Sequence, residues 1–361
     1  MIKNKKLRIT FRIIFCVLFT FIIYLYVGFI LMPKTVEDKG GLKYYSTTSY
    51  IYEPKNSIDV MMFGNSDLYN GFSPIELYKE TGIISFNCGK SQQTVPVIYE
   101  QLKKTLTLQQ PKLVVLEADC IFYDKKEFAG NNYKAILLRA PVKYHVRWKD
   151  LTLKDFYTIP TMKNRTNYLK GFVFDGRISG YKVSENYMKD FDAEPKEIKE
   201  NAKNYLIKCI DLCKENNIPF LIMGIPSPNT WSMACNKGLN KFVNEYNEKQ
   251  TDYKINCIDM NLKPEKLAFD FDTYFKDNGN HCNYMGAKAV TTFMGDYLKE
   301  NYPFLKDRRN DNVSNWNKSV KMYDDYIAKH HKNKDKHKPD KNEEKNTNKI
   351  QSLNNDIQNE N

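Results

Sequence analysis

The sequence predicts a three-layer α/β domain built on a central parallel sheet and attached to one membrane-spanning helix. Three observations point there: short continuous apolar runs, amphipathic stretches between them, and an uncharged run of twenty residues near the N-terminus. Continuously apolar strands are typical of a sheet covered on both faces, which is the parallel arrangement with helices on each side. A chain of 361 residues is long enough for such a core.

The expected strands and helices alternate along the chain. The strand-like runs are residues 58–63, 83–86, 112–118, 218–225 and 253–260, and the helical stretches are 74–82, 95–110, 195–217 and 284–302. We therefore expect one α/β domain over residues 56–305. Residues 119–190 break the alternation, because they are aromatic and basic with weak periodicity. They are expected to be an insertion beside the sheet edge that carries the site, where they would wall a cleft or contact a partner.

The N-terminal residues predict a single membrane anchor. Residues 1–12 carry five basic side chains and no acid, and residues 13–32 are uncharged. Twenty apolar residues span a bilayer as a helix, whereas the apolar region of a cleavable signal is shorter. Because the basic cluster precedes the span, the positive-inside rule predicts a cytoplasmic N-terminus. Residues 33–55 are then a stem, and the domain beyond it lies outside the cell membrane.

The composition of the C-terminal part predicts a disordered basic tail. From residue 306 to residue 361 the chain is dominated by Lys, Asn, Asp and His, with few apolar residues to bury. The formal net charge of +12 comes partly from this tail and partly from the N-terminal stub. A solvated spacer is the expected role, with contact to anionic wall polymers or headgroups as the alternative. No nucleic-acid partner, metal or cofactor is expected.

The eight cysteines are expected to be reduced. Cys16 lies in the predicted span, which leaves an odd number outside it. Cys88, Cys120 and Cys257 lie in or beside predicted buried strands, where cysteine behaves as a small apolar residue. We therefore expect core thiols rather than structural disulfides.

Polar residues follow three of the predicted strands and indicate a site. The strand ends carry Gly64–Asp67, Asn87–Ser91 and Glu117–Asp119. The carboxyl ends of parallel strands meet at one edge of a sheet, where sites form. A turn of this kind is an ordinary β-to-α connection, but it also displays nucleophilic serines such as Ser66. Three of the five histidines lie in the tail, which leaves His145 and His281 as possible bases. His281 precedes the last helix and is therefore expected at the same edge as Ser66.

Three motifs in this order resemble the SGNH/GDSL hydrolase superfamily. They are "MMFGNSDLYNGFSP" (61–74), "FNCGKSQ" (86–92) and "DNGNHCNYMGAKAV" (277–290). More narrowly, residues 56–303 are similar to membrane-anchored SGNH-like proteins of the DltD and alginate O-acetyltransferase type. The resemblance implies a flavodoxin-like fold with Ser66 as nucleophile and His281 as general base. It also implies oxyanion N–H donors from Gly89 and from the backbone of Ser66.

The sequence departs from that family pattern at two places. The family commonly has its acid three residues before the histidine, where this chain has Asn278, so Asp277 is predicted to orient the imidazole instead. The Gly-x-Asn block that usually supplies an oxyanion amide is absent, and Asn65 or Asn87 is the expected replacement. At the end of the third strand, Glu117 and Asp119 would bind a substrate hydroxyl or cap the following turn.

Three functions are consistent with these residues. The first is an acyltransferase that passes an acyl group to a hydroxyl of a cell-surface polysaccharide or teichoic-acid-like polymer. Its implied partner is a membrane-bound O-acyltransferase. The second is an acetyl-ester hydrolase that uses the same residues. The third is an inactive adaptor that keeps the fold and binds the polymer or the transferase.

Overall fold

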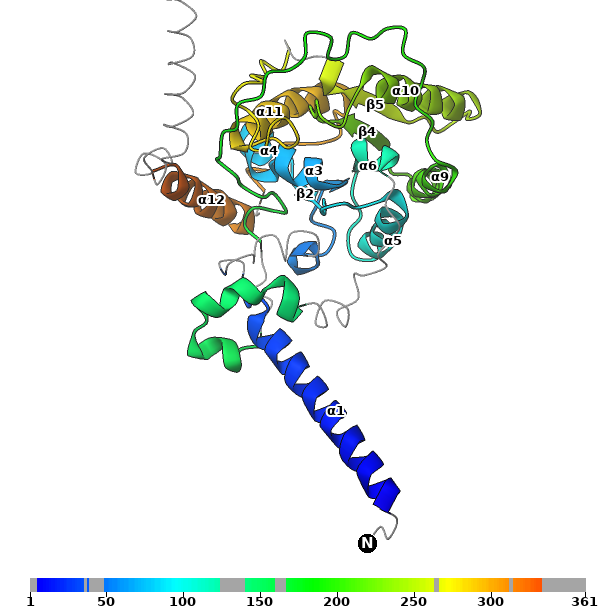
Figure 1. Cartoon of the computed structure of the whole chain (residues 1–361). Helices are drawn as coiled ribbons and strands as arrows, with labels where there is room; N and C mark the ends of the chain where they lie inside the picture. The colour runs from blue at the N-terminus through cyan, green and yellow to red at the C-terminus, as the bar shows by residue number, and fades with distance from the viewer. Residues whose placement is uncertain are drawn as a thin grey trace, which may run out of the picture.

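The structure is a computed structural model that describes residues 5–35, 38, 49–123, 140–159, 167–262, 266–311 and 314–332. A five-stranded sheet forms its centre, and a long N-terminal helix extends away from it (Figure 1). All strand pairs are parallel: β1 (Val60–Phe63), β2 (Ser85–Asn87), β3 (Leu113–Glu117), β4 (Phe220–Gly224) and β5 (Asn256–Asp259). The order β2-β1-β3-β4-β5 is the flavodoxin-like one, as predicted.

Helices cover both faces of this sheet and complete three layers. One face is covered by α5 (Val95–Leu106), α9 (Glu200–Glu215) and α10 (Met233–Glu248). The other is covered by α3 (Ser66–Gly71), α4 (Pro74–Thr81) and α11 (Tyr284–Asn301). Alternate residues of each strand point to opposite faces, so Met61 packs in the first core and Met62 in the second. The predicted fold class is confirmed.

Local sequence signals explain where α4 begins and ends. The Ser73 side chain accepts a hydrogen bond from the Glu76 N–H, and Pro74 occupies the first turn. The helix ends at Gly82, which has a φ of 76°. That left-handed conformation suits glycine, and a Cβ there would lie 1.8 Å from Asp307 Oδ1.

The sequence interpretation missed the core helix α10 (Met233–Glu248). Helix α10 follows β4, and its apolar side chains Leu239, Phe242, Val243 and Tyr246 pack into the core. Ser232 caps its N-terminus by accepting from the Cys235 N–H. Both the helical spacing and the cap were present in the sequence.

Six of the eight free cysteines are buried, among them Cys88, Cys120, Cys209 and Cys213 in the core beneath α5 and α9. Their burial agrees with the predicted core thiols Cys88 and Cys120, whereas Cys257 is only partly buried.

The prediction of a disordered tail from residue 306 is wrong for residues 314–332. These residues form α12 (Ser314–Lys332), which packs against α4 (Figure 1). Trp316 and Tyr323 are 1% and 0% exposed. The physical reason is spacing: Trp316, Val320, Tyr323 and Ile327 repeat at helical intervals and share one face. The prediction of disorder rested on the polar average composition of residues 306–361, which does not reveal this apolar stripe. The tail beyond residue 332 lies outside the described residues.

The predicted membrane anchor is helical over its whole length. Helix α1 (Lys5–Leu31) is long and apolar enough to cross a membrane. At the other end of the predicted stem, η1 (Ser49–Tyr52) joins the folded domain, because Tyr50 is buried in the core. Glu53 forms a buried ion pair with Lys170 at 2.7 Å. Residues 49–53 are therefore part of the domain rather than stem.

The predicted insertion divides into two parts with different positions. Residues 140–159 pack against the C-terminal end of α1 rather than beside the site, which corrects the prediction for this part. Residues 167–181 do follow the site edge of the sheet. The Lys170 carbonyl accepts from the Asn87 N–H, and the Val173 N–H donates to the Tyr69 carbonyl. Residues 124–139 and 160–166 lie outside the described residues.

Candidate active site

Ser66, His281 and Asp277 are joined by two hydrogen bonds. Ser66 is the first residue of α3, directly after β1, and its Oγ lies 2.8 Å from His281 Nε2. His281 Nδ1 lies 2.6 Å from Asp277 Oδ2. An ionised carboxylate only accepts, so the ring proton belongs on Nδ1, and Nε2 is left to accept from the Ser66 hydroxyl. The structure therefore assembles the three predicted catalytic residues in the order that a serine nucleophile requires.

The loop before α11 explains how an acid four residues upstream reaches the imidazole. Asn278 and Gly279 both have positive φ angles, 56° and 79°, which fold the chain back on itself. Asp277 Oδ1 then accepts from the His281 backbone N–H at 2.7 Å, while Oδ2 holds the ring. An antiparallel bridge between Phe275 and Cys282 closes the base of the loop. Asn278 points elsewhere, with Oδ1 accepting from the Ser179 hydroxyl.

The charges around Asp277 keep it ionised. Burial raises the pKa of this carboxyl, but the hydrogen bonds from His281 and the electrostatic attraction of His281 and Lys276 outweigh burial. The net result is a pKa below the ordinary value. Asp277 is therefore an acceptor at neutral pH. All three residues retain access to solvent: Ser66 is partly exposed, and the His281 and Asp277 side chains are 18% and 38% exposed.

Two residues that the sequence interpretation did not select support the nucleophile. Asn70 lies one helical turn after Ser66, and its Nδ2 donates to the Ser66 carbonyl at 2.7 Å. Lys276 Nζ donates to Asn70 Oδ1, also at 2.7 Å. This chain of contacts links the nucleophile's helix to the loop that carries the base. The i,i+4 spacing of Ser66 and Asn70 was visible in the sequence, whereas the contact with Lys276 spans 206 positions.

Asn65 shapes the turn that presents Ser66. Its Oδ1 caps α3 by accepting from the Asp67 N–H at 2.8 Å, and its Nδ2 donates to Asp119 Oδ2 at 2.6 Å. The Ser66 N–H is the first amide of the helix, so helical geometry gives it no intrahelical partner. It lies beside Oγ, where a tetrahedral oxyanion would form. Asn65 Nδ2 carries a second hydrogen besides the one given to Asp119, and the predicted oxyanion role of Asn65 stays a prediction.

The predicted oxyanion roles of Gly89 and Asn87 are wrong in this geometry. The Gly89 N–H donates to Asn87 Oδ1 at 2.9 Å, and an N–H has only one hydrogen to give. Asn87 Nδ2 donates to the carbonyls of Leu68 and Phe72, and its side chain is fully buried. The Gly89 N–H and the Asn87 side-chain N–H groups are therefore used in hydrogen bonds within the protein. Those of Asn87 hold α3 in position.

The two acids at the end of β3 have different positions. Glu117 is 1% exposed, and its Oε1 accepts from the Asp119 N–H at 2.6 Å. A predicted contact with substrate is therefore wrong for Glu117, and the capping alternative is observed. A Cβ on Gly64 would lie only 2.5 Å from Glu117 Cβ, so this packing requires the glycine. Asp119 is partly exposed beside Asn65, and its substrate-binding role stays a prediction.

Asp67 completes a cluster of carboxyl groups behind the nucleophile. Burial raises the pKa of Asp67 well above its ordinary value, and the charges of Asp119 and Asp277 raise it further. The pKa of Glu117 is also raised well above the ordinary range, by burial and then by Asp67 and Asp119. Burial of these two carboxyl groups beside one another therefore favours their protonated, hydrogen-bond-donating form. Among the described residues, no group of His, Cys, Asp and Glu is suited to a metal ion.

His145 lies away from the triad. Its Nδ1 is 2.6 Å from the Val142 carbonyl, in the part of the insertion that packs against α1. His281 is therefore the histidine that the structure places at Ser66.

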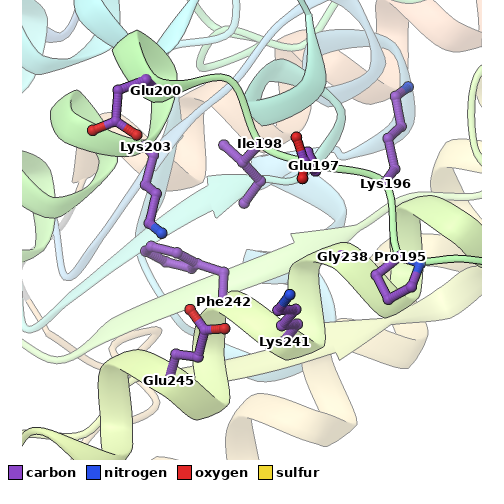
Figure 2. Close-up of a pocket in the computed structure, with 10 residues that line it drawn as sticks. All are labelled: Pro195, Lys196, Glu197, Ile198, Glu200, Lys203, Gly238, Lys241, Phe242 and Glu245. Carbon is purple, nitrogen blue, oxygen red and sulfur yellow. The ribbon is translucent and has the colours of Figure 1, made fainter.

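A cavity of about 270 Å³ lies between residues 195–203 and α10, and none of the triad residues lines it (Figure 2). Its lining includes three lysines and three glutamates, and Lys203 points towards Phe242.

No family model matches the sequence, and no curated protein is similar to it. Among solved structures, similar ones include a putative lipolytic protein of the G-D-S-L family from Desulfitobacterium hafniense. It is 12% identical, with a TM-score of 0.35, and the match covers 66% of this chain and 98% of that one. A family 3 carbohydrate esterase of Clostridium thermocellum is 13% identical over 67% and 96% of the two chains, with a TM-score of 0.37. A putative acylhydrolase of Bacteroides fragilis is 14% identical over 73% and 98%, with a TM-score of 0.36. TM-scores at this level carry no argument on their own, and the chemistry of the site rests on its geometry.

Proposed function

We propose that the protein is a membrane-anchored serine enzyme that moves an acyl group by way of an ester on Ser66. One observation carries this proposal: the continuous hydrogen-bonded chain from Asp277 through His281 to the Ser66 hydroxyl. A histidine held by an acid on one side and by a serine hydroxyl on the other is the arrangement that activates serine as a nucleophile. An inactive adaptor would need neither bond.

The first half of the reaction forms the acyl-serine. His281 Nε2 removes the hydroxyl proton as Ser66 Oγ attacks the carbonyl carbon of the donor ester. The carbonyl π electrons move to oxygen, and the Ser66 N–H stabilises that oxyanion. When the oxyanion collapses, the donor C–O bond breaks and His281 gives its proton to the departing alkoxide. Asp277 stabilises the imidazolium throughout, while its own proton state is unchanged.

The second half passes the acyl group to an acceptor. His281 removes a proton from an acceptor hydroxyl, the acceptor oxygen attacks the acyl-serine, and Ser66 recovers the proton as it leaves. We favour a hydroxyl of a cell-surface polymer as the acceptor, with a membrane-bound O-acyltransferase supplying the acyl group. The apolar helix α1 supports this assignment, since it would hold the domain outside the membrane with its N-terminus in the cytoplasm. If water is the acceptor, the same residues make an acetyl-ester hydrolase.

The proposal is tested with the full chain in detergent and an activated acetyl ester. We expect turnover that Ser66→Ala abolishes and Ser91→Ala retains, because Ser91 is an exposed serine outside the triad. Adding a polyol in increasing concentration separates transfer from hydrolysis, since a transferase forms acetylated polyol at the expense of acetate. Equal turnover in wild type and Ser66→Ala, with both proteins folded by circular dichroism, would contradict the proposal.

A further inference from the structure

Residues 140–159, which we call the juxtamembrane segment, wrap the C-terminal end of α1 (Figure 1). The segment contains two short 3₁₀ helices, η2 (His145–Asp150) and η3 (Leu153–Phe156). Ala140 and Tyr144 form a small buried cluster with Leu31 and Met32. The Tyr26 hydroxyl, which belongs to α1 itself, donates to the Phe156 carbonyl at 3.2 Å. The segment therefore lies alongside the last turns of α1, and not only beyond the C-terminal end of the helix.

Arg147 fastens the segment to the end of α1. Its Nη1 donates to the carbonyls of Leu31 and Met32 at 3.0 and 2.6 Å, and its side chain is 3% exposed. These carbonyls belong to the last turn, where helical geometry leaves them without intrahelical donors. Asp155 pairs with Nη2 at 2.9 Å, so the buried guanidinium is neutralised within the segment. The contact between the segment and α1 is therefore a buried, hydrogen-bonded one.

The outer face of the segment exposes an unusual amount of apolar surface. Seven of the fourteen exposed large apolar side chains described outside α1 lie within these twenty residues. They are Val142, Val146, Trp148, Leu153, Phe156, Tyr157 and Ile159. Leu153 is 83% exposed and Ile159 is 75% exposed. An apolar surface of this density on a soluble domain marks a site that something else covers.

The position of the segment along α1 indicates what covers it. Tyr26 precedes Leu31 by five residues, which is about 7.5 Å along a helix axis at 1.5 Å per residue. The apolar surface is thus continuous with the exposed apolar surface of α1, which the bilayer would cover. Interfacial segments bury their apolar faces to a depth of about 5–10 Å. The short 3₁₀ helices fit that zone, because irregular backbone is excluded from the hydrocarbon beneath it.

The polar residues of the segment match lipid headgroups. Lys143, Lys149 and Lys154 are exposed among the apolar residues, and a basic polar face is attracted to anionic lipids. Trp148 and Tyr157, which are 64% and 69% exposed, are the residue types enriched at membrane interfaces. Residues 13–31 of α1 carry no basic side chain, so the basic side chains near this end of the helix come from the segment.

We propose that residues 140–159 insert into the headgroup region of the leaflet at the C-terminal end of α1 and bind anionic lipid there. The inference goes beyond the proposed acyl transfer and rests on α1 crossing the membrane. Because Arg147 ties the segment to α1, the domain has a second attachment to the bilayer and a restricted orientation over it. A membrane protein on the same surface is the competing occupant, and the experiment separates the two.

Trp148 provides the probe, because the chain has three tryptophans and the other two are buried. Trp231 and Trp316 are 4% and 1% exposed. The full chain is placed in lipid nanodiscs that contain phosphatidylcholine and phosphatidylglycerol, with bromine atoms near the headgroup end of the acyl chains. We expect bromolipid to quench part of the emission, and Trp148→Phe to remove that quenched part. Aqueous iodide should quench little of it.

Two double variants place the probe on and off the surface. In the Trp148→Phe background, Leu153→Trp should restore quenching by bromolipid. Phe191→Trp should not, because Phe191 is 70% exposed but lies beside α10, where its carbonyl accepts from Lys237. A third variant, Ile22→Trp in the same background, reports whether α1 itself is in the bilayer. Because residue 22 lies about 13.5 Å along the helix from Leu31, this variant is measured with lipid that carries bromine near the ends of the acyl chains.

The outcomes decide the proposal. Quenching at positions 22, 148 and 153 but not 191 supports it. Quenching at position 22 alone, with iodide reaching Trp148, overturns it, and protection of Trp148 from iodide only in native membranes then indicates a protein on this surface. Absence of quenching at position 22 also overturns it, because the segment cannot enter a leaflet that α1 does not cross. None of these results depends on catalytic activity, so they are separable from a failure of the proposed function.

Discussion

Asp277 holds His281 by two hydrogen bonds, one to the ring Nδ1 and one to the backbone N–H of the same residue. The carboxylate therefore fixes the imidazole's orientation and the loop conformation together. This double contact makes a spacing of four residues workable, and it places the loop at the centre of the catalytic account.

Replacing His281 should reduce activity strongly, whereas replacing His145 should not. His281→Ala removes the base and should lower kcat/KM by about 10⁴ or more, as removal of a serine-triad member does. Asp277→Ala should lower it less, because it removes the orienting group and not the base. His145→Ala is the matched control and should leave kcat/KM close to wild type, since His145 lies against α1. Steady-state kinetics, with circular dichroism to confirm folding, measures all three. A sensitive His145 together with a tolerant His281 would show that the base is misassigned.

At position 278, we expect the protein to tolerate residues that can adopt the left-handed backbone conformation of Asn278 and to be impaired by residues that cannot. Its φ of 56° is accessible to glycine, so Asn278→Gly should keep most activity despite the lost contact with Ser179. Asn278→Val forces a β-branched residue into the left-handed region, which costs about 1–2 kcal/mol or more. We expect a lower melting temperature and a lower kcat from this variant, because the strain is relieved by moving Asp277. Thermal unfolding and kinetics on the same samples check both effects. If valine were as active as glycine, the loop conformation would not matter to the site.

The carboxyl cluster should make stability depend on pH in a specific direction. The pKa of Asp67 is raised in the folded protein above its ordinary value of 3.8, so the folded state binds the proton more tightly than the unfolded state. The resulting stability is fully present below pH 3.8 and is lost as pH rises through the raised pKa. Asp67→Asn cannot ionise and should lose less stability over that range.

Thermal unfolding of both proteins across the pH range measures this effect. The melting temperature of Asp67→Asn relative to wild type should increase as pH rises from acid to neutral. The exposed acid Asp272 gives the matched control, because Asp272→Asn should change the profile little. A constant difference between wild type and Asp67→Asn at every pH would mean that Asp67 holds no proton in the folded protein.

Helix α12 should contribute substantially to stability. Trp316 is 1% exposed, packs on Tyr78 with ring centroids 5.1 Å apart, and lies under the Lys170 ammonium. Truncating a buried aromatic residue of this size typically costs about 3–5 kcal/mol. Trp316→Ala should therefore lower the melting temperature by several degrees or more. Met322→Ala in the same helix should have little effect, because Met322 is 38% exposed. Equal effects of the two substitutions would indicate that the helix is not docked.

Sequence alone predicted the sheet and the triad because both depend on local signals. Short apolar runs marked the first four strands and an apolar–polar alternation marked the fifth, and the parallel arrangement brought Ser66 and His281 to one edge across 215 positions. The oxyanion donors were harder, because whether an N–H is free depends on a three-dimensional partner. Gly89 is the clearest case, since its hydrogen bond to Asn87 is invisible in the motif that suggested it.

The remaining errors come from tertiary contacts that composition does not reveal. Residues 314–332 are strongly polar, and only the apolar stripe of α12 against α4 gives them a buried face. The insertion was treated as one unit, yet one part packs on α1 and the other follows the site. Nothing in local periodicity marks that division. Arg147, which makes the first of these contacts, resembles any other residue of a basic stretch until its partners Leu31 and Met32 are known.

The most direct test of the central claim is a covalent one. The full chain is treated with a fluorophosphonate, which reacts with activated serines, and the modified residue is located by peptide mass mapping. We expect a single adduct on Ser66, absent from Ser66→Ala and strongly reduced in His281→Ala, with Ser91→Ala labelled like the wild type. A folded protein that takes up no label, or one labelled at another serine while Ser66 stays free, would contradict it.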